Sequence, residues 1–134
     1  MDLLVNIDVP DLPGAEAFYT DAFGLRVTRR FGGEALELSG LPAKLYLLKK
    51  AEGTTGAGDD QRHYRRHWTP VHLDIVVEDL DVALSRAQAA GAVLDVPPRT
   101  HVWGKIAVLA DPFGNGFCLL QFLGEGYDEI AVRP

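Results

Sequence analysis

The sequence predicts an α+β fold made of two tandem βαβββ modules, and three observations lead to this expectation. A strand-and-helix opening occurs twice at a constant spacing, and three strand-like runs follow each opening. A chain of 134 residues with 47% hydrophobic side chains is typical of one soluble globular domain. Because one such module does not bury its sheet by itself, the two modules are expected to share a core.

The repeat is clearest where each half begins. Residues 4–12 read Leu-Val-Asn-Ile-Asp-Val-Pro-Asp-Leu, and residues 72–80 read His-Leu-Asp-Ile-Val-Val-Glu-Asp-Leu. The matched pairs are Ile7 and Ile75, Val9 and Val77, Asp11 and Asp79, Leu12 and Leu80, and Ala15 and Ala83. Chance similarity of two amphipathic openings is the alternative, but the order of the later strands repeats as well, which favours duplication.

The first module is assigned to residues 1–50. Leu3 to Val9 is expected to be a half-buried strand, Asp11 to cap a helix, and Gly24 to end that helix. Three further strands are expected over 25–30, 34–38 and 44–49, with glycine-rich turns between them.

The second module is assigned to residues 69–123. A strand is expected over 71–77, followed by a helix that begins after Asp79 and ends at Gly91. Strands are then expected over 92–96, 105–110 and 117–122, and the turn at 111–116 should join the last two as a hairpin.

Residues 51–68 are expected to be a linker, and residues 124–134 a polar C-terminal tail without an assigned role. His63 and His67 have the spacing that would place both on one face of a helix. Solvated linker residues are the favoured interpretation of this basic stretch. The alternative is that the arginines close over an anionic ligand; they are Arg62, Arg65 and Arg66.

Charge and composition exclude several classes of partner. The net charge of −6 argues against nucleic acid, which requires clustered Lys and Arg. No apolar run approaches the roughly 20 residues that span a bilayer, so no membrane segment is expected. The single cysteine, Cys118, forms no intrachain disulfide, and the first residues do not resemble a secretory signal, so a cytoplasmic location is expected.

Two motifs give the chain a family resemblance. Residues 11–25 contain Asp-Leu, Phe-Tyr and Phe-Gly-Leu in that order, and residues 111–119 read Asp-Pro-Phe-Gly-Asn-Gly-Phe-Cys-Leu, with Trp-Gly-Lys at 103–105 ahead of them. Together with the doubled βαβββ order, these motifs resemble the vicinal oxygen chelate superfamily of glyoxalases, bleomycin-resistance proteins and extradiol dioxygenases. The resemblance covers nearly the whole chain and is specific for the fold, whereas the superfamily hosts many reactions.

The resemblance implies that the sheets curve into a cup with the helices outside. In the superfamily the cup holds a divalent metal, bound by a His on the first strand and a Glu on the last strand of each module. The corresponding residues here are Leu4, Tyr46, His72 and Cys118. The resemblance therefore implies that most of the metal site is lost. No cofactor is expected, and the alternative is a divalent metal held through His72.

His72 and Cys118 are the candidate catalytic residues. His72 would act as a ligand or general base, or else as a buried structural residue that donates to a carbonyl. Cys118 would be a soft metal ligand or a thiolate activated by a nearby cation, or else a small core residue. In a cup-shaped site, Tyr46, Trp103 and Leu4 are the expected ligand-binding residues.

Three functions fit these expectations. The first is binding of a small organic ligand without a metal, as in the antibiotic-sequestering members that the chain resembles. The second is a small-molecule enzyme, a lyase, isomerase or dioxygenase that uses His72 in a rearranged metal site. The third is an interaction module whose cup is filled by its own side chains. The resemblance also implies a homodimer.

Overall fold

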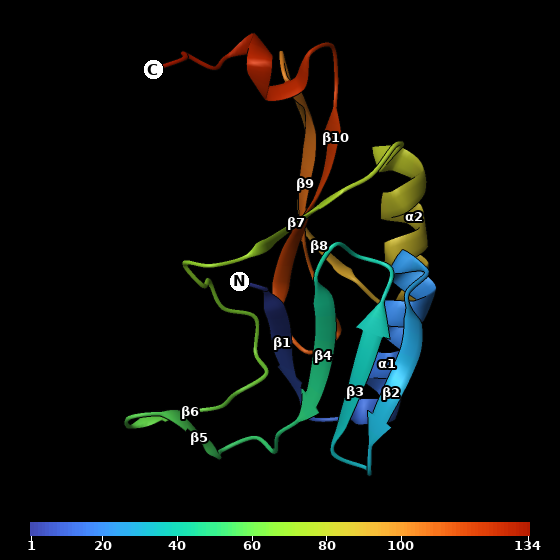
Figure 1. Cartoon of the computed structure of the whole chain (residues 1–134), viewed down its shortest axis with the longest axis vertical. Coiled ribbons are helices and arrows are strands. Elements are labelled where there is room, and N and C mark those ends of the chain that lie inside the picture. Colours follow the sequence, from blue (N-terminus) through green and yellow to red (C-terminus); the bar gives the residue numbers. More distant parts are fainter.

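The computed structural model describes residues 1–134 and confirms the α+β fold with two similar modules (Figure 1). The first module consists of β1 (Leu4–Val9), α1 (Leu12–Phe23), β2 (Arg26–Phe31), β3 (Ala35–Ser39) and β4 (Lys44–Lys49). The second consists of β7 (Leu73–Val76), α2 (Leu80–Ala90), β8 (Val93–His101), β9 (Gly104–Ala110) and β10 (Gly116–Phe122). A small hairpin, β5 (Thr55–Ala57) and β6 (Asp60–Gln61), lies between them, and a 3₁₀ turn (Gly126–Glu129) follows β10.

Each module forms its own four-stranded mixed sheet, and the two sheets have the same strand order. The order is β1-β4-β3-β2 in the first and β7-β10-β9-β8 in the second, and in each the first strand runs parallel to the last. The identical topology supports duplication of one unit. Both β1 and β7 remain edge strands, so the expected cup is not closed within one chain (Figure 1).

The helix boundaries follow the signals in the sequence. The carboxylates of Asp11 and Asp79 accept hydrogen bonds from the backbone N–H three residues further along, at 3.1 and 3.2 Å. Gly24 and Gly91 end the helices with φ of 67° and 116°, a region that disfavours other residues. Neither helix is long and apolar enough to cross a membrane.

The two modules share one hydrophobic core, as the repeat predicts. A single cluster of 17 buried residues draws on both helices and both sheets. Its aromatic centre crosses the module boundary, because the ring of Phe117 on β10 lies 5.3 Å from Phe23 and 6.4 Å from Phe18 on α1. The opposite face of each sheet is turned away from the helices and is called here the open face.

The segment between the modules is more ordered than a solvated linker. Besides the β5–β6 hairpin, Arg62 donates to Asp8 on β1 at 2.7 Å, and Arg66 donates to Asp95 on β8 at 2.6 Å. Arg62 is thus less solvated than expected, whereas Arg66 remains exposed, and each neutralises a carboxylate of a neighbouring module. No helix forms around His63 and His67, although their rings lie 4.6 Å apart.

β8 is longer than the sequence suggests and continues through Pro97 and Pro98. The register shifts on either side of Val96, and β8 is the edge strand of its sheet. An edge strand tolerates proline because its outer N–H groups have no strand to pair with. Beyond β10, Tyr127 of the tail packs its ring against Trp103 and Phe122.

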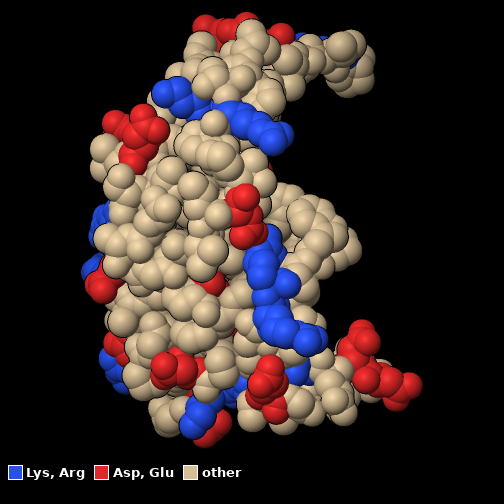
Figure 2. Space-filling model, turned by 180° about the vertical axis from the view of Figure 1, so that it is seen from behind, with Lys and Arg blue, Asp and Glu red and all other residues tan.

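One side of the molecule shows how its charged side chains are distributed (Figure 2). On the side shown in Figure 2, acidic and basic residues are interspersed with large areas of uncharged atoms. The net charge of −6 is therefore not concentrated in one acidic surface on this side.

Candidate functional site

The turn between β9 and β10 connects the modules through a buried carboxylate. Asp111 is 1% exposed and accepts four hydrogen bonds: from Tyr19 Oη at 2.6 Å, from the backbone N–H of Phe113 and Asn115 at 2.8 and 2.9 Å, and from Asn115 Nδ2 at 2.9 Å. Asn115 Nδ2 also donates to the carbonyl of Asp8 on β1. Burial and the adjacent Asp111 raise the pKa of Tyr19 well above its usual value. These motif residues therefore have a structural role.

The larger of the two best-formed cavities lies at the junction of the modules and has a volume of about 360 Å³. It is lined by the edge strands β1 and β7, by α1, and by the β9–β10 turn. Most of the lining is hydrophobic. The polar and titratable side chains at its wall are Asn6, Asp8, Tyr19, His67, Thr69, His72 and Asn115.

The smaller cavity, of about 200 Å³, is lined by two side chains of a kind that can bind a metal or exchange a proton. His72 and Cys118 both line it, together with Arg66 and Trp68. His72 Nε2 lies 3.3 Å from Asp74 Oδ1, and Asp74 pairs in register with Cys118. The ligand atoms of His72, Asp74 and Cys118 all lie within 4.8 Å of one another.

Asp74 is not among the site residues predicted from the sequence, although its spacing of two residues from His72 pointed to it. Successive residues of a strand point to opposite sides, so Asp74 lies on the same side as His72 two positions earlier. The partner across the strands could not be read locally, because the pairing of β7 with β10 joins residues more than 40 positions apart.

The environment of Cys118 favours the protonated thiol. Burial, followed by the neighbouring Asp74 carboxylate, raises the pKa of Cys118 to about 11, and Arg66 offsets this only in part. An activated thiolate needs a dominant cation next to the sulfur, and here the nearest charged group is an anion. The thiol is therefore neutral at physiological pH unless a bound cation displaces its proton.

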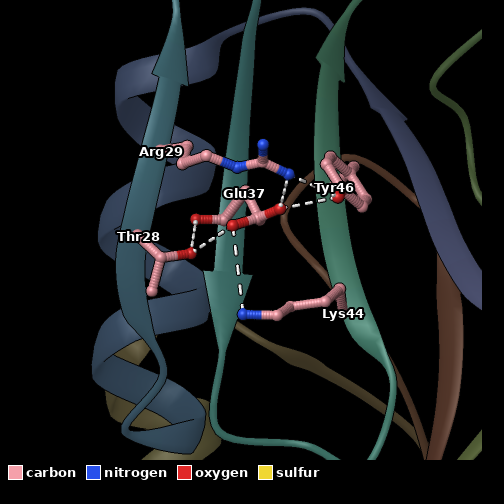
Figure 3. Close-up of polar contacts among 5 residues, drawn as sticks. All are labelled: Thr28, Arg29, Glu37, Lys44 and Tyr46. Atoms are coloured by element: carbon pink, nitrogen blue, oxygen red, sulfur yellow. Dashed lines mark hydrogen bonds and ion pairs between the residues drawn. The ribbon is translucent and has the colours of Figure 1, made fainter.

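Tyr46 and Cys118 occupy equivalent positions in the two modules. Tyr46 pairs with Asn6 and Cys118 with Asp74, and Asn6 and Asp74 correspond in the repeat. Tyr46 lines neither of the two cavities described above, however. Its hydroxyl donates to Glu37 at 2.6 Å within a polar cluster on the open face of the first sheet (Figure 3).

The other predicted ligand-binding residues have different surroundings. Leu4 is more than half exposed at the start of β1, and Trp103 stacks on His101 with ring centres 4.8 Å apart. Leu4, Tyr46 and Trp103 line neither of the two cavities. The structure thus brings His72 and Cys118 together and leaves the other three outside, and their role in ligand binding stays a prediction.

The donor set differs from the His and Glu ligands that the resemblance implies for a metal centre. Leu4 has no donor atom, and the hydroxyl of Tyr46 is engaged by Glu37. His72, Asp74 and Cys118 instead offer one imidazole, one carboxylate and one thiol. That combination suits a borderline or soft cation such as Zn²⁺ better than Mg²⁺ or Ca²⁺, which prefer oxygen ligands alone.

Comparison with known families gives one clear match. The model of the glyoxalase-like domain family matches residues 4–120, which is most of the chain. Among curated proteins, the uncharacterized protein Mb0911c of Mycobacterium bovis is 38% identical over 66 residues. This alignment covers 48% of the chain and 43% of the relative, so the chain spans less than half the length of that protein.

Solved structures show the same fold at low identity. A glyoxalase/bleomycin resistance protein/dioxygenase family enzyme from Burkholderia phytofirmans has a TM-score of 0.70 at 23% identity, covering 92% of this chain and 100% of that chain. The fosfomycin resistance protein FosX from Listeria monocytogenes has a TM-score of 0.73 at 16% identity, covering 96% and 95%. That structure is of a Glu-to-Gln mutant in complex with Mn(II) and 1S,2S-dihydroxypropylphosphonic acid.

Proposed function

The chain belongs to the glyoxalase-like domain family, and from that premise we propose that it binds a small organic molecule between its two modules, without the usual metal centre of the superfamily. The observation that carries this proposal is the larger cavity. Its volume of about 360 Å³ lies within the range of small-molecule sites, roughly 300–1,000 Å³. A mainly apolar wall with a few convergent polar groups is also typical of such sites.

The polar groups indicate how a ligand would be oriented. His67 and His72 lie on the second module's side of the cavity, and Asn6 and Asp8 lie on β1. A ligand with one hydrogen-bonding end and an apolar body would satisfy both parts of the wall. An interaction module filled by its own side chains would have no cavity of this size, so the cavity argues against that alternative.

The proposal is tested by filling the cavity from β7. Ile75 lines the cavity, whereas Val76, the next residue, is 57% exposed on the open face and lines neither cavity. We expect compounds from a panel of small aromatic and carbonyl ligands to raise the melting temperature of the wild type by several degrees. Ile75→Phe should abolish this shift, because the added ring occupies the site, and Val76→Phe should retain it.

Two results would count against ligand binding at the junction. The first is an equal ligand-induced shift in Ile75→Phe and in the wild type. The second is a shift lost equally in both variants, which would place the ligand elsewhere. The melting temperature of each variant without ligand reports any cost of overpacking, expected to be about 1–3 kcal/mol for Ile75→Phe.

A second candidate function is metal-assisted catalysis, of the lyase or dioxygenase type, at the smaller cavity. The observation that favours it is the approach of His72, Asp74 and Cys118 within 4.8 Å. A metal with open positions polarises substrate oxygens and lowers the pKa of bound water. Here these three side chains would hold the ion, and the neighbouring cavity of about 200 Å³ would admit the substrate.

We further propose that two chains associate as a homodimer. β1 and β7 are unpaired edge strands, and an exposed edge is open to pairing with another chain. Large apolar side chains on or near these strands are more than half exposed: Leu4, Trp68, Val71 and Val76. A second copy would cover these surfaces. Sedimentation equilibrium at micromolar concentration should give the mass of two chains, and the mass of one chain would overturn the proposal.

A further inference from the structure

A buried carboxylate stands on the open face of the first sheet, with no helix to cover it. Glu37 lies on β3 between Leu36 and Leu38, which point into the core, and its side chain is only 5% exposed. The carboxylate is enclosed by side chains from the neighbouring strands β2 and β4 (Figure 3). Thr28 and Tyr46 donate to it at 2.7 and 2.6 Å.

Arg29 completes this enclosure through a single nitrogen. Its Nη2 donates to Glu37 Oε2 and, at 3.3 Å, to the hydroxyl of Tyr46. A register irregularity between Val27 and Arg29 is what places both Thr28 and Arg29 opposite Glu37. Hydrogen bonds from Arg29, then from Tyr46 and Thr28, lower the pKa of Glu37 to about 2, so this carboxylate stays ionised and is a poor general base.

The rest of the Arg29 guanidinium faces solvent. Its Nε and Nη1 have no hydrogen-bond partner within the chain, and the side chain is 62% exposed. The guanidinium carbon lies 5.4 Å from the centre of the Phe31 ring, and the rings of Phe31 and Tyr46 are 6.3 Å apart. Arg29 is thus held in one orientation, with unused donors beside two aromatic rings.

The local charge is positive in an acidic protein. Lys44 on β4 approaches Glu37 Oε1 at 3.9 Å and is also about half exposed. Two cations therefore share one carboxylate, which leaves an excess positive charge on this patch of a chain whose net charge is −6. An anion arriving here would be attracted without displacing Glu37, because Arg29 has donors to spare.

We propose that Arg29, oriented by Glu37, binds the acid group of a planar aromatic carboxylate on the open face of the first sheet. The free Nη1 of Arg29 donates to the ligand's acid group, Lys44 adds a second positive charge, and Phe31 and Tyr46 contact the flat body of the ligand. This inference goes beyond the proposed function, because none of these residues lines either cavity.

The experiment compares a charged probe with a neutral probe of the same shape. We expect the wild type to bind 2-naphthoate about fivefold more tightly than 2-naphthamide in a fluorescence titration, the amount that an exposed charged hydrogen bond supplies. Arg29→Gln should reduce this ratio to about one. Arg30→Gln removes the same charge from the next residue of β2, which pairs with Glu16 on the helix side, and should leave the ratio unchanged.

Other variants separate this site from the alternatives. Arg29→Lys keeps the charge and the partner of Glu37 but loses the extra donors, so it should fold and show a reduced ratio. Equal affinities for the two probes in the wild type would overturn the proposal. An equal loss in Arg29→Gln and Arg30→Gln would overturn it too, since that result indicates non-specific attraction. So would loss of naphthoate preference in Ile75→Phe, which would place the probe in the larger cavity.

Discussion

Replacing Asp111 with alanine is expected to lower the free energy of unfolding by about 3–5 kcal/mol. The side chain is 1% exposed and accepts hydrogen bonds from the Tyr19 hydroxyl and from three N–H donors of the β9–β10 turn. Removal of the carboxylate leaves these donors unsatisfied, at a cost of about 1–3 kcal/mol for each that water does not reach. The loss should also weaken the contact between α1 and the second module, because Tyr19 belongs to α1.

Urea denaturation followed by circular dichroism measures this effect. Tyr19→Phe removes only one of the donors and should cost about 1 kcal/mol. Asp128→Ala provides the control, because this exposed carboxylate meets only the exposed Arg133, and its removal should change stability by no more than about 0.5 kcal/mol. An Asp111→Ala variant as stable as the Asp128→Ala control would show that the Asp111 network does not hold the modules together.

A cobalt titration is expected to separate the second candidate function from the first. If His72, Asp74 and Cys118 hold a metal, Co²⁺ should produce a thiolate-to-cobalt charge-transfer band in the wild type. His72→Ala should eliminate the band by removing one of three ligands. His101→Ala is the matched control, because His101 stacks on Trp103 and lines neither cavity, and it should leave the band unchanged.

The pH dependence of this band has a defined sign. The pKa of Cys118 is raised to about 11, and metal binding requires the thiolate, so binding must release its proton. Apparent affinity should therefore rise by about tenfold per pH unit through the neutral range if Cys118 is the only group that loses a proton. Absence of the band, or a band that persists in His72→Ala, would contradict the site and leave the metal-free binding proposal in place.

The helices and most strands could be predicted because their signals are local. Asp11, Gly24, Asp79 and Gly91 mark the helix ends through contacts within one turn, and the alternation of residues marks the strands. The repeat then predicted the shared core without any knowledge of pairing. The length of β8 was underestimated. Its prolines are acceptable only on an edge strand, and the sequence does not say which strand is at the edge.

The candidate site was predicted only in part. His72 and Cys118 were identified through the resemblance, and the structure places them at one cavity. Asp74 was overlooked, although its position two residues after His72 would have supported it. The structural roles of Arg62 and Arg66 were hidden, because their carboxylate partners lie 54 and 29 residues away in the chain.

By itself the sequence determined the class of fold, the two modules and their helix limits. Tertiary structure alone decided that the larger cavity lies between the modules, that Cys118 faces a carboxylate, and that Glu37 orients Arg29 on the open face. The physical reason is the range of the interactions. Caps and periodicity act over a few residues, whereas cavities, pKa shifts and ion pairs depend on strands that meet only after the chain has folded.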